Sequence, residues 1–271
     1  MQALPHPHLP TQASEGSVLR ARAMQGYLLE LRSALSRYRP IPSIHLMVLN
    51  QEDWNARARN PYGFAFQRTS PRGGLFVFLP ARYPERLLWR LREVLLSAAK
   101  QGGLPSRIEE FLDLNLGHEY AHAVAVAWGL RTRVHWVDEF LANYLWLLAL
   151  SQTNPDFFKL ARSWGHTLTH LTPTNPQLGS YERKKPGVSD QLWFQGQFTS
   201  LAAELVGKHQ DQLLLGLLEA APLKRSTVHK VLVGLEPSFK RWFAEFSPKK
   251  QALPPLEKQS VGWESPSQES R

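Results

Sequence analysis

The sequence contains no cysteine among its 271 residues. This absence excludes disulfide bonds, thiolate zinc ligands and cysteine nucleophiles, and it is consistent with a cytosolic protein. The first residues lack the basic cluster and apolar core of a signal peptide. No run of about 18 apolar residues occurs either, so we expect no membrane span and a cytoplasmic location.

The sequence also lacks a glycine-rich phosphate loop, a zinc-finger pattern and an RNP-like motif. Its net charge is nevertheless +9, from 32 basic and 23 acidic residues. Such a balance is compatible with a nucleic-acid partner. However, the basic residues are scattered along the chain, and an arginine-rich composition gives the same balance without a binding role. Nucleic acid therefore stays a possible partner that is not favoured.

One short motif carries chemistry, the HExxH sequence His118-Glu-Tyr-Ala-His122. Positions i and i+4 of a helix share one face, so the two imidazoles can converge on one metal ion. Glu119 follows the first histidine, where its carboxylate can take a proton from a metal-activated water. The flanking residues 115–117 and 123–124 carry no charge, as expected for a buried helix. We therefore predict a Zn²⁺ site.

A catalytic zinc ion usually has three protein ligands, so a third is required. His135, Asp138 and Glu139 lie within five positions at the start of the next expected helix. Asp138 lies about 100° around that helix from Glu139, so both cannot face one ion. His135 precedes the helix and reaches inward only if the turn folds back. We select Glu139.

With this ligand set, residues 114–150 resemble the gluzincins, which are zinc peptidases with an HExxH helix and a Glu ligand on a following helix. In that family the second helix often carries Glu-x-x-Ala/Ser-Asp/Asn, and here Glu139 is followed by Ala142 and Asn143. The separation of the Glu from the motif is slightly short for the family. Upstream, Trp54, residues 61–63 and residues 74–79 resemble a strand-rich region of some uncharacterised zinc-peptidase-like proteins.

Asn143 is the expected outer partner of the zinc site. It follows Glu139 by four residues and so faces the same way. Its side-chain oxygen can accept the N–H of a zinc-bound histidine and fix the tautomer. An ordinary polar role on the helix surface is the alternative.

The resemblance further implies a Tyr or His that stabilises the oxyanion. Tyr181, His166 and His170 are candidates, and we choose Tyr181 because it lies in a Pro- and Gly-rich segment, residues 171–189, expected to border the cleft. None of the three can be aligned with a motif, so a structural role stays open for each.

Hydrophobic periodicity predicts an α+β fold that is mostly helical. We expect a small N-terminal β-sheet packed on a zincin-like active-site helix, followed by a C-terminal helical bundle. Residues 1–16 are predicted to be a flexible tail, residues 17–246 a metallopeptidase domain, and residues 247–271 a disordered tail. Apolar runs predict strands at 44–49 and 75–79, with a possible short strand at 62–67. Helical spacing and caps predict helices at 18–38, 84–100, 136–150, 154–166, 190–206, 211–219, 226–232 and 237–246.

Two further expectations concern the active-site region. Ser106-x-x-Glu109 has the pattern of a capping box that opens the HExxH helix. Strand 75–79 is expected to offer an edge with which an extended substrate can pair.

These features predict a zinc metallopeptidase that hydrolyses a peptide or protein substrate. His118, His122 and Glu139 would hold zinc, and Glu119 would act as the general base. One alternative is a regulatory protein that keeps the zinc site without catalysis. Another is a basic nucleic-acid-associated protein with a structural metal.

Overall fold

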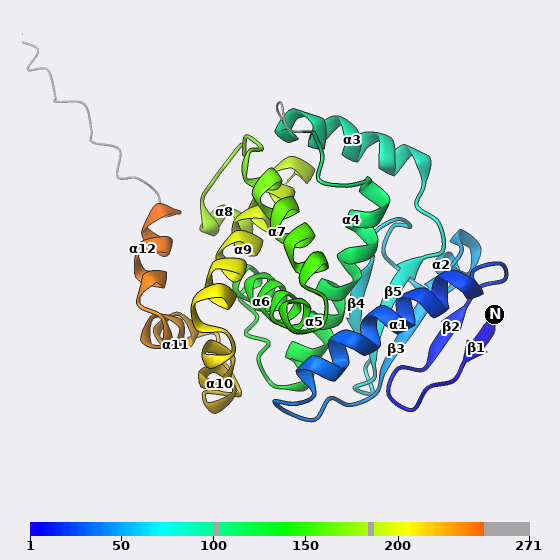
Figure 1. The fold of residues 1–271 in the computed structure, drawn as a ribbon, viewed down its shortest axis with the longest axis horizontal. Coiled ribbons are helices and arrows are strands. Elements are labelled where there is room, and N and C mark those ends of the chain that lie inside the picture. The colour runs from blue at the N-terminus through cyan, green and yellow to red at the C-terminus, as the bar shows by residue number, and fades with distance from the viewer. Residues whose placement is uncertain (100–102, 184–186, 247–271) are drawn as a thin grey trace, which may run out of the picture.

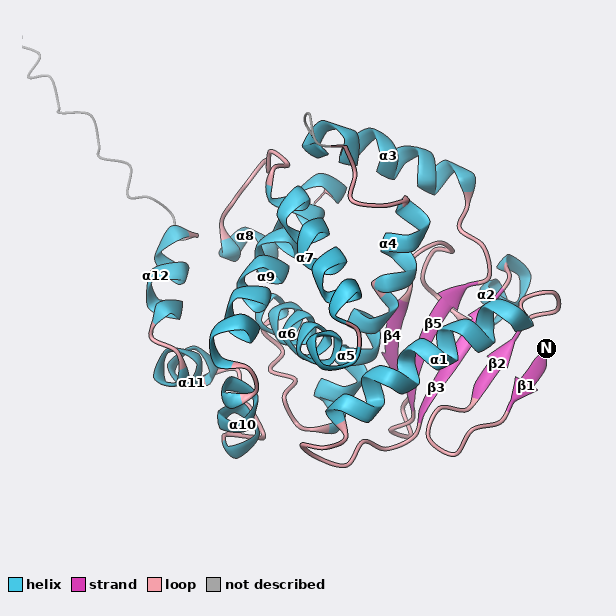
Figure 2. Ribbon diagram, viewed as in Figure 1, coloured by secondary structure: helices cyan, strands magenta, loops and turns pink. Residues whose placement is uncertain are grey.

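A computed structural model describes residues 1–99, 103–183 and 187–246. It confirms an α+β fold that is mostly helical, with a small N-terminal mixed sheet and a helical C-terminal region. Figures 1 and 2 show the sheet at one side of the molecule and most of the helices on the other. No helix in the described ranges is long and apolar enough to cross a membrane.

Five strands of the described chain form one sheet in the order β1-β2-β3-β5-β4. β3 pairs in parallel with β2 and β5, while β1 and β4 are antiparallel to their neighbours. The strands are β1 (Gln2–Leu4), β2 (Thr11–Ala13), β3 (Ile44–Leu49), β4 (Phe66–Thr69) and β5 (Leu75–Pro80).

The apolar run of β3 is buried on both faces of the sheet. Ile44, Leu46 and Val48 join the main core, whereas Met47 and Leu49 join a smaller cluster with Trp54 on the opposite face. A strand covered on both sides loses the alternation of polar and apolar residues. This explains why residues 44–49 are apolar at every position except His45, and the predicted bounds are confirmed.

Two predictions about the sheet are wrong. Residues 1–16 contain β1 and β2, because Leu4, Leu9 and Ala13 are buried in the core. Their apolar side chains outweigh the proline-rich composition from which a flexible tail was predicted. The strand at residues 75–79 is not an edge, since β5 lies between β3 and β4. β4 is the edge strand next to the HExxH helix, which it contacts.

The predicted helices are present, with shifted ends and some additional short ones. They are α1 (Val18–Leu35), α2 (Gln51–Arg57), α3 (Glu85–Ala99), α4 (Ile108–Leu114), α5 (Leu116–Ala127), α6 (His135–Thr153), α7 (Pro155–Thr169), α8 (Leu178–Arg183), α9 (Val188–His209), α10 (Gln212–Glu219), α11 (Val228–Leu235) and α12 (Ser238–Glu245). The Asn154 side chain accepts from the Phe157 N–H and caps α7, as its sequence predicts. The predicted C-terminal tail lies outside the described residues.

The capping box predicted at Ser106 is wrong. Ser106 makes no capping hydrogen bond, and its hydroxyl donates to the Arg107 carbonyl. The segment after it is a separate helix, α4, and the HExxH helix begins after a bend at Asn115. The Asn115 carbonyl then accepts from His118 N and Glu119 N.

Glu236 joins the last helices to the body through a buried carboxylate. It accepts hydrogen bonds from the Ser238 N–H and from Lys208, and it contacts His209. The hydrogen bonds from Ser238 outweigh burial and, with Lys208 and His209, lower the pKa of Glu236 to about 2.

We expect Glu236→Gln to destabilise the protein at neutral pH and to destabilise it less at low pH. A depressed pKa adds stability above the unfolded-state pKa of about 4.5, and this stability is lost as the pH falls toward 2. Denaturant unfolding at pH 7 and pH 3 measures the difference, with the exposed Glu245→Gln as the control. If the wild type exceeded Glu236→Gln in free energy of unfolding by the same amount at both pH values, the lowered pKa of Glu236 would be contradicted.

Candidate metal centre

The HExxH motif lies on α5, which packs against α6, the helix that carries Glu139. Close contact at the start of α5 depends on Gly117. A Cβ atom at this position would lie 2.4 Å from the Tyr27 hydroxyl and 2.5 Å from Trp146 Nε1. Any larger residue would push α5 away from α1 and α6. Gly117 therefore helps to place His118 opposite Glu139.

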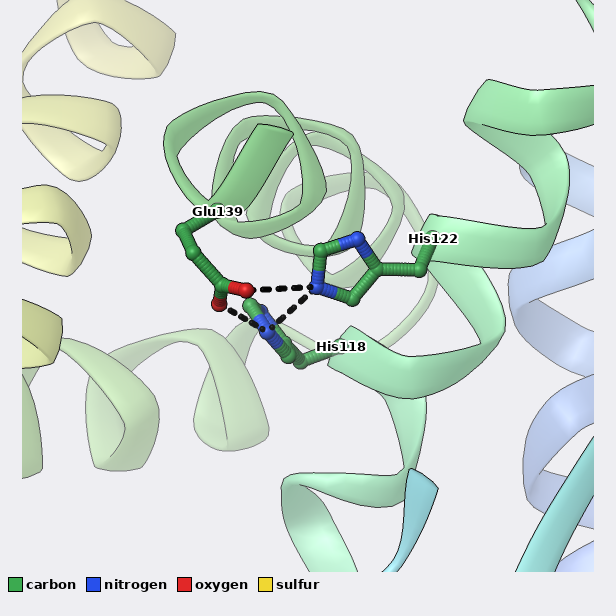
Figure 3. A group of neighbouring side chains, drawn as sticks. All are labelled: His118, His122 and Glu139. Atoms are coloured by element: carbon green, nitrogen blue, oxygen red, sulfur yellow. Dashed lines mark hydrogen bonds and ion pairs between the residues drawn. The ribbon is translucent and has the colours of Figure 1, made fainter. Parts of the chain in front are cut away.

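The three predicted ligands converge in space. His118 Nε2 lies 3.2 Å from Glu139 Oε2, and His122 Nε2 lies 3.5 Å from Glu139 Oε1. The two Nε2 atoms are 3.1 Å apart. Figure 3 shows both imidazoles, one helical turn apart on α5, pointing toward the carboxylate that α6 presents. These atoms form a group that can hold a metal ion.

The spacing of these atoms matches tetrahedral zinc. With zinc–ligand bonds of about 2.0–2.2 Å, two ligand atoms of a tetrahedron lie about 3.3–3.6 Å apart. The three observed separations, 3.1, 3.2 and 3.5 Å, are close to this range. Two imidazoles and one carboxylate also form a ligand set typical of catalytic zinc, which leaves a fourth position open. The residues of the site therefore fit the ion predicted from the sequence.

The electrostatics of the group favour a cation at its centre. Burial opposes ionisation of Glu139, but the nearby His122 and His118 lower its pKa well below the ordinary value. Burial alone would lower the pKa of His122, because it disfavours the charged imidazole. The carboxylates of Glu139 and Glu119 outweigh burial and raise this pKa to about 9. The two carboxylates thus favour positive charge at the position of the histidines.

Glu119 lies beside this group and contacts the edge of the sheet. Its Oε2 accepts a 2.9 Å hydrogen bond from the backbone N–H of Gln67 on β4. Burial raises the pKa of the Glu119 carboxyl, although the two histidines and the Gln67 N–H act in the opposite direction. A carboxylate whose pKa lies above its usual value is better suited to accept a proton near neutral pH.

A cavity of about 240 Å³ opens next to Glu119, His122 and Glu139. Its walls come from β4, α5, α6 and the loop between the two helices. The lining residues are Phe66, Gln67, Glu119, His122, Ala125, Val126, Leu130, Arg131, His135, Asp138, Glu139 and Leu141. Glu119, His122 and Glu139 are therefore accessible to a small group that enters from solvent.

Asn143 contacts the site through a partner that differs from the expected one. Its side-chain oxygen accepts from the Thr199 hydroxyl at 3.0 Å, so the predicted contact with a histidine N–H is not formed. Its amide instead donates to the Glu139 carbonyl and to Gln195 Oε1, each at 3.0 Å. Nδ1 of His118 is buried without a hydrogen-bond partner among the described residues. Asn143 thus contacts the Glu139 backbone and Gln195.

Gln195 on α9 is the residue that sequence reasoning missed. Its amide donates a 2.6 Å hydrogen bond to Glu139 Oε2, while its oxygen accepts from Asn143. The bond orients the Glu139 carboxylate toward the histidines. The available signal was a pair of polar residues four positions apart, Gln195 and Thr199, among the buried apolar residues of α9.

We expect Gln195→Met to weaken zinc binding by about 10–100-fold, the usual range for an outer partner of a metal ligand. Methionine has a similar length but cannot donate a hydrogen bond to the Glu139 carboxylate. Competition against a zinc chelator of known affinity measures the change. Gln191→Met, at an exposed position of the same helix, is the control. Equal affinity in both variants would show that Gln195 does not position the ligand.

Asp138 takes the place expected from its spacing, whereas His135 belongs to the helix that it was expected to precede. The Asp138 carboxylate points to the preceding loop, where it accepts from Thr132 N, the Thr132 hydroxyl and Arg133 N. It is therefore engaged away from the metal group. His135 is the first residue of α6, and its Nδ1 lies 3.6 Å from Glu139 Oε1. Its side chain is half exposed and lines the cavity.

The three candidates for an oxyanion donor lie in different places. Tyr181 is buried on α8 with its ring stacked on His135 at 4.7 Å, and its hydroxyl has no hydrogen-bond partner among the described residues. Burial and the nearby Glu139 raise its pKa. Tyr181 is not among the residues that line the cavity. His166 and His170 lie together at the end of α7, outside that lining.

Comparisons with known proteins give no further information about the site. No protein-family model matches the chain, and neither curated proteins nor solved structures give a match. The gluzincin resemblance therefore rests on the residues of the site and stays a prediction.

Proposed function

We propose that this protein is a zinc-dependent peptidase. The observation that carries the proposal is the convergence of His118, His122 and Glu139 at separations suited to tetrahedral zinc, beside a cavity that Glu119 also lines. A structural zinc site has four protein ligands and no open position, whereas three ligands next to a cavity are typical of catalysis. Peptide-bond hydrolysis is the reaction that a Glu next to such ligands supports best.

In this proposal one side chain of the protein transfers a proton, and others hold a zinc ligand in its orientation. Zinc bound by the three ligands would lower the pKa of a water molecule toward 7 and polarise the peptide carbonyl. Glu119 accepts the proton of the attacking water and passes it to the leaving amine. Gln195 and Asn143 hold the Glu139 carboxylate in place.

We assign the oxyanion donor to His135 in preference to Tyr181. Both lie near Glu139, but only His135 lines the cavity in which a substrate carbonyl would be placed. Tyr181 stacks against the His135 ring and so restricts its orientation. A donor fixed before the reaction stabilises developing negative charge without the cost of reorganisation.

The alternative function is zinc binding without hydrolysis, for instance in a regulatory protein. It is favoured by the hydrogen bond from Gln67 N to Glu119, which occupies one oxygen of the proposed base. The other carboxylate oxygen makes no hydrogen bond within the described residues, so the base can still accept a proton.

A peptide library distinguishes the two functions. Zinc-loaded protein is incubated with a mixture of peptides of known sequence, and mass spectrometry detects new termini. Cleavage that is absent from the Glu119→Gln variant supports the peptidase. A fully zinc-loaded wild-type protein that cleaves no peptide supports the alternative.

A further inference from the structure

An exposed, positively charged residue, Arg131, lines the cavity beside the metal group. Arg131 lines it together with Glu119 and Glu139, and it is the one lysine or arginine in the described lining. The side chain belongs to the loop between α5 and α6, whereas the proposed base and ligands belong to the helices. A group that occupies the cavity can therefore lie next to both the metal group and the positive charge of Arg131.

The loop that carries Arg131 is held in place on both sides. Before it, Leu130 N donates to the Ala125 carbonyl at 2.8 Å, which closes the end of α5. After it, Thr132 N and the Thr132 hydroxyl donate to Asp138 Oδ1 at 2.7 and 2.8 Å. A side chain between two anchored residues presents its charge from a defined backbone position, as binding residues require.

Arg131 has no partner for its charge within the described part of the chain. No hydrogen bond or ion pair of its guanidinium is formed there, although the Asp138 carboxylate lines the same cavity. That carboxylate already accepts from Thr132 and Arg133. A guanidinium next to a cavity binds carboxylates through paired hydrogen bonds, which are stronger than those between neutral groups.

We propose that Arg131 binds a carboxylate of the substrate and so makes the site selective for an acidic group next to the scissile bond. This inference rests on the proposed peptidase function. The cavity volume, about 240 Å³, is below the roughly 300–1,000 Å³ of sites that take drug-sized ligands. It therefore suits one residue, whose carboxylate is either an Asp or Glu side chain or the carboxyl terminus of a peptide.

Four small probes separate these two sources of the carboxylate. In each probe, a short acyl group on the nitrogen of an amino acid carries a hydroxamate at its far end. The hydroxamate is a zinc ligand. The amino acids are leucine as the free acid, leucine amide, glutamate amide and glutamine amide. Dissociation constants are measured by calorimetry on zinc-loaded protein, so no turnover is required. The proteins are the wild type, Arg131→Gln and the control Arg133→Gln, whose exposed arginine lies on the same loop but outside the cavity lining.

We expect at least one acidic probe to bind the wild type and Arg133→Gln about tenfold more tightly than its neutral counterpart. Arg131→Gln should remove that preference while it keeps binding of the neutral probes. Preference for leucine acid over leucine amide identifies a chain terminus, and preference for glutamate amide over glutamine amide identifies a side chain. Equal binding of acidic and neutral probes to the wild type, or a preference that survives Arg131→Gln, would overturn the role of Arg131 alone. If no probe binds the zinc-loaded wild type, the open metal position is wrong, and the proposed function and this inference both fail.

Discussion

Purified without added metal, the protein should contain about one zinc ion per chain, and a strong chelator should remove it and lower the melting temperature. A ligand that binds only the folded state adds about 2.7 kcal/mol when its free concentration is 100 times its Kd. Elemental analysis gives the stoichiometry, and thermal unfolding with and without chelator gives the shift. The shift should be absent from His118→Ala, because Nε2 of this residue contacts both other ligands.

Single substitutions separate the ligands from their neighbours. His122→Ala and Glu139→Ala should weaken zinc binding beyond the roughly 10–100-fold expected for an outer partner. Asp138→Ala should keep zinc but lower stability, since its carboxylate holds Thr132 and Arg133 of the loop. His135→Ala should also keep zinc. If Asp138→Ala abolished zinc binding while Glu139→Ala left it intact, the metal group would have another geometry.

The candidate site could be predicted to the extent that it is local in sequence. The i,i+4 spacing of His118 and His122 and the position of Glu139 near the start of the next helix depend on periodicity within a few turns. In the same way, the apolar run of β3 was sufficient to give its bounds. The structure then adds what spacing cannot give, namely that α5 and α6 pack so closely that the three side chains meet.

What could not be predicted depends on contacts between distant segments. Gln195 contacts Glu139 from 56 positions away, so the local pair of Gln195 and Thr199 does not indicate which residue it contacts. β1 and β2 are each three residues long, too short for strand alternation to be recognised. Their place in the sheet is set by pairing of β2 with β3 and of β1 with β2. The break at Asn115 separates α4 from α5 without a proline or a glycine at that position.

Glu119→Gln should retain zinc and lose hydrolysis. The carboxylate is not one of the three converging ligands, so its replacement leaves the metal group intact. An amide cannot accept the proton of the attacking water, and loss of a general base typically costs about 10²–10⁴ in rate. The amide oxygen can still accept the hydrogen bond from Gln67 N, so the position of β4 should be unchanged.

Three measurements on one preparation make this prediction specific. Elemental analysis should show equal zinc in wild type and Glu119→Gln, thermal unfolding should show similar stability, and the initial rate on a cleaved peptide should fall by at least about 100-fold. Glu110→Gln, at an exposed position of α4, is the matched control and should keep full activity. Full activity in Glu119→Gln would mean that another group accepts the proton. Loss of zinc would instead make Glu119 part of the metal group, and the cavity would then face a ligand and not a base.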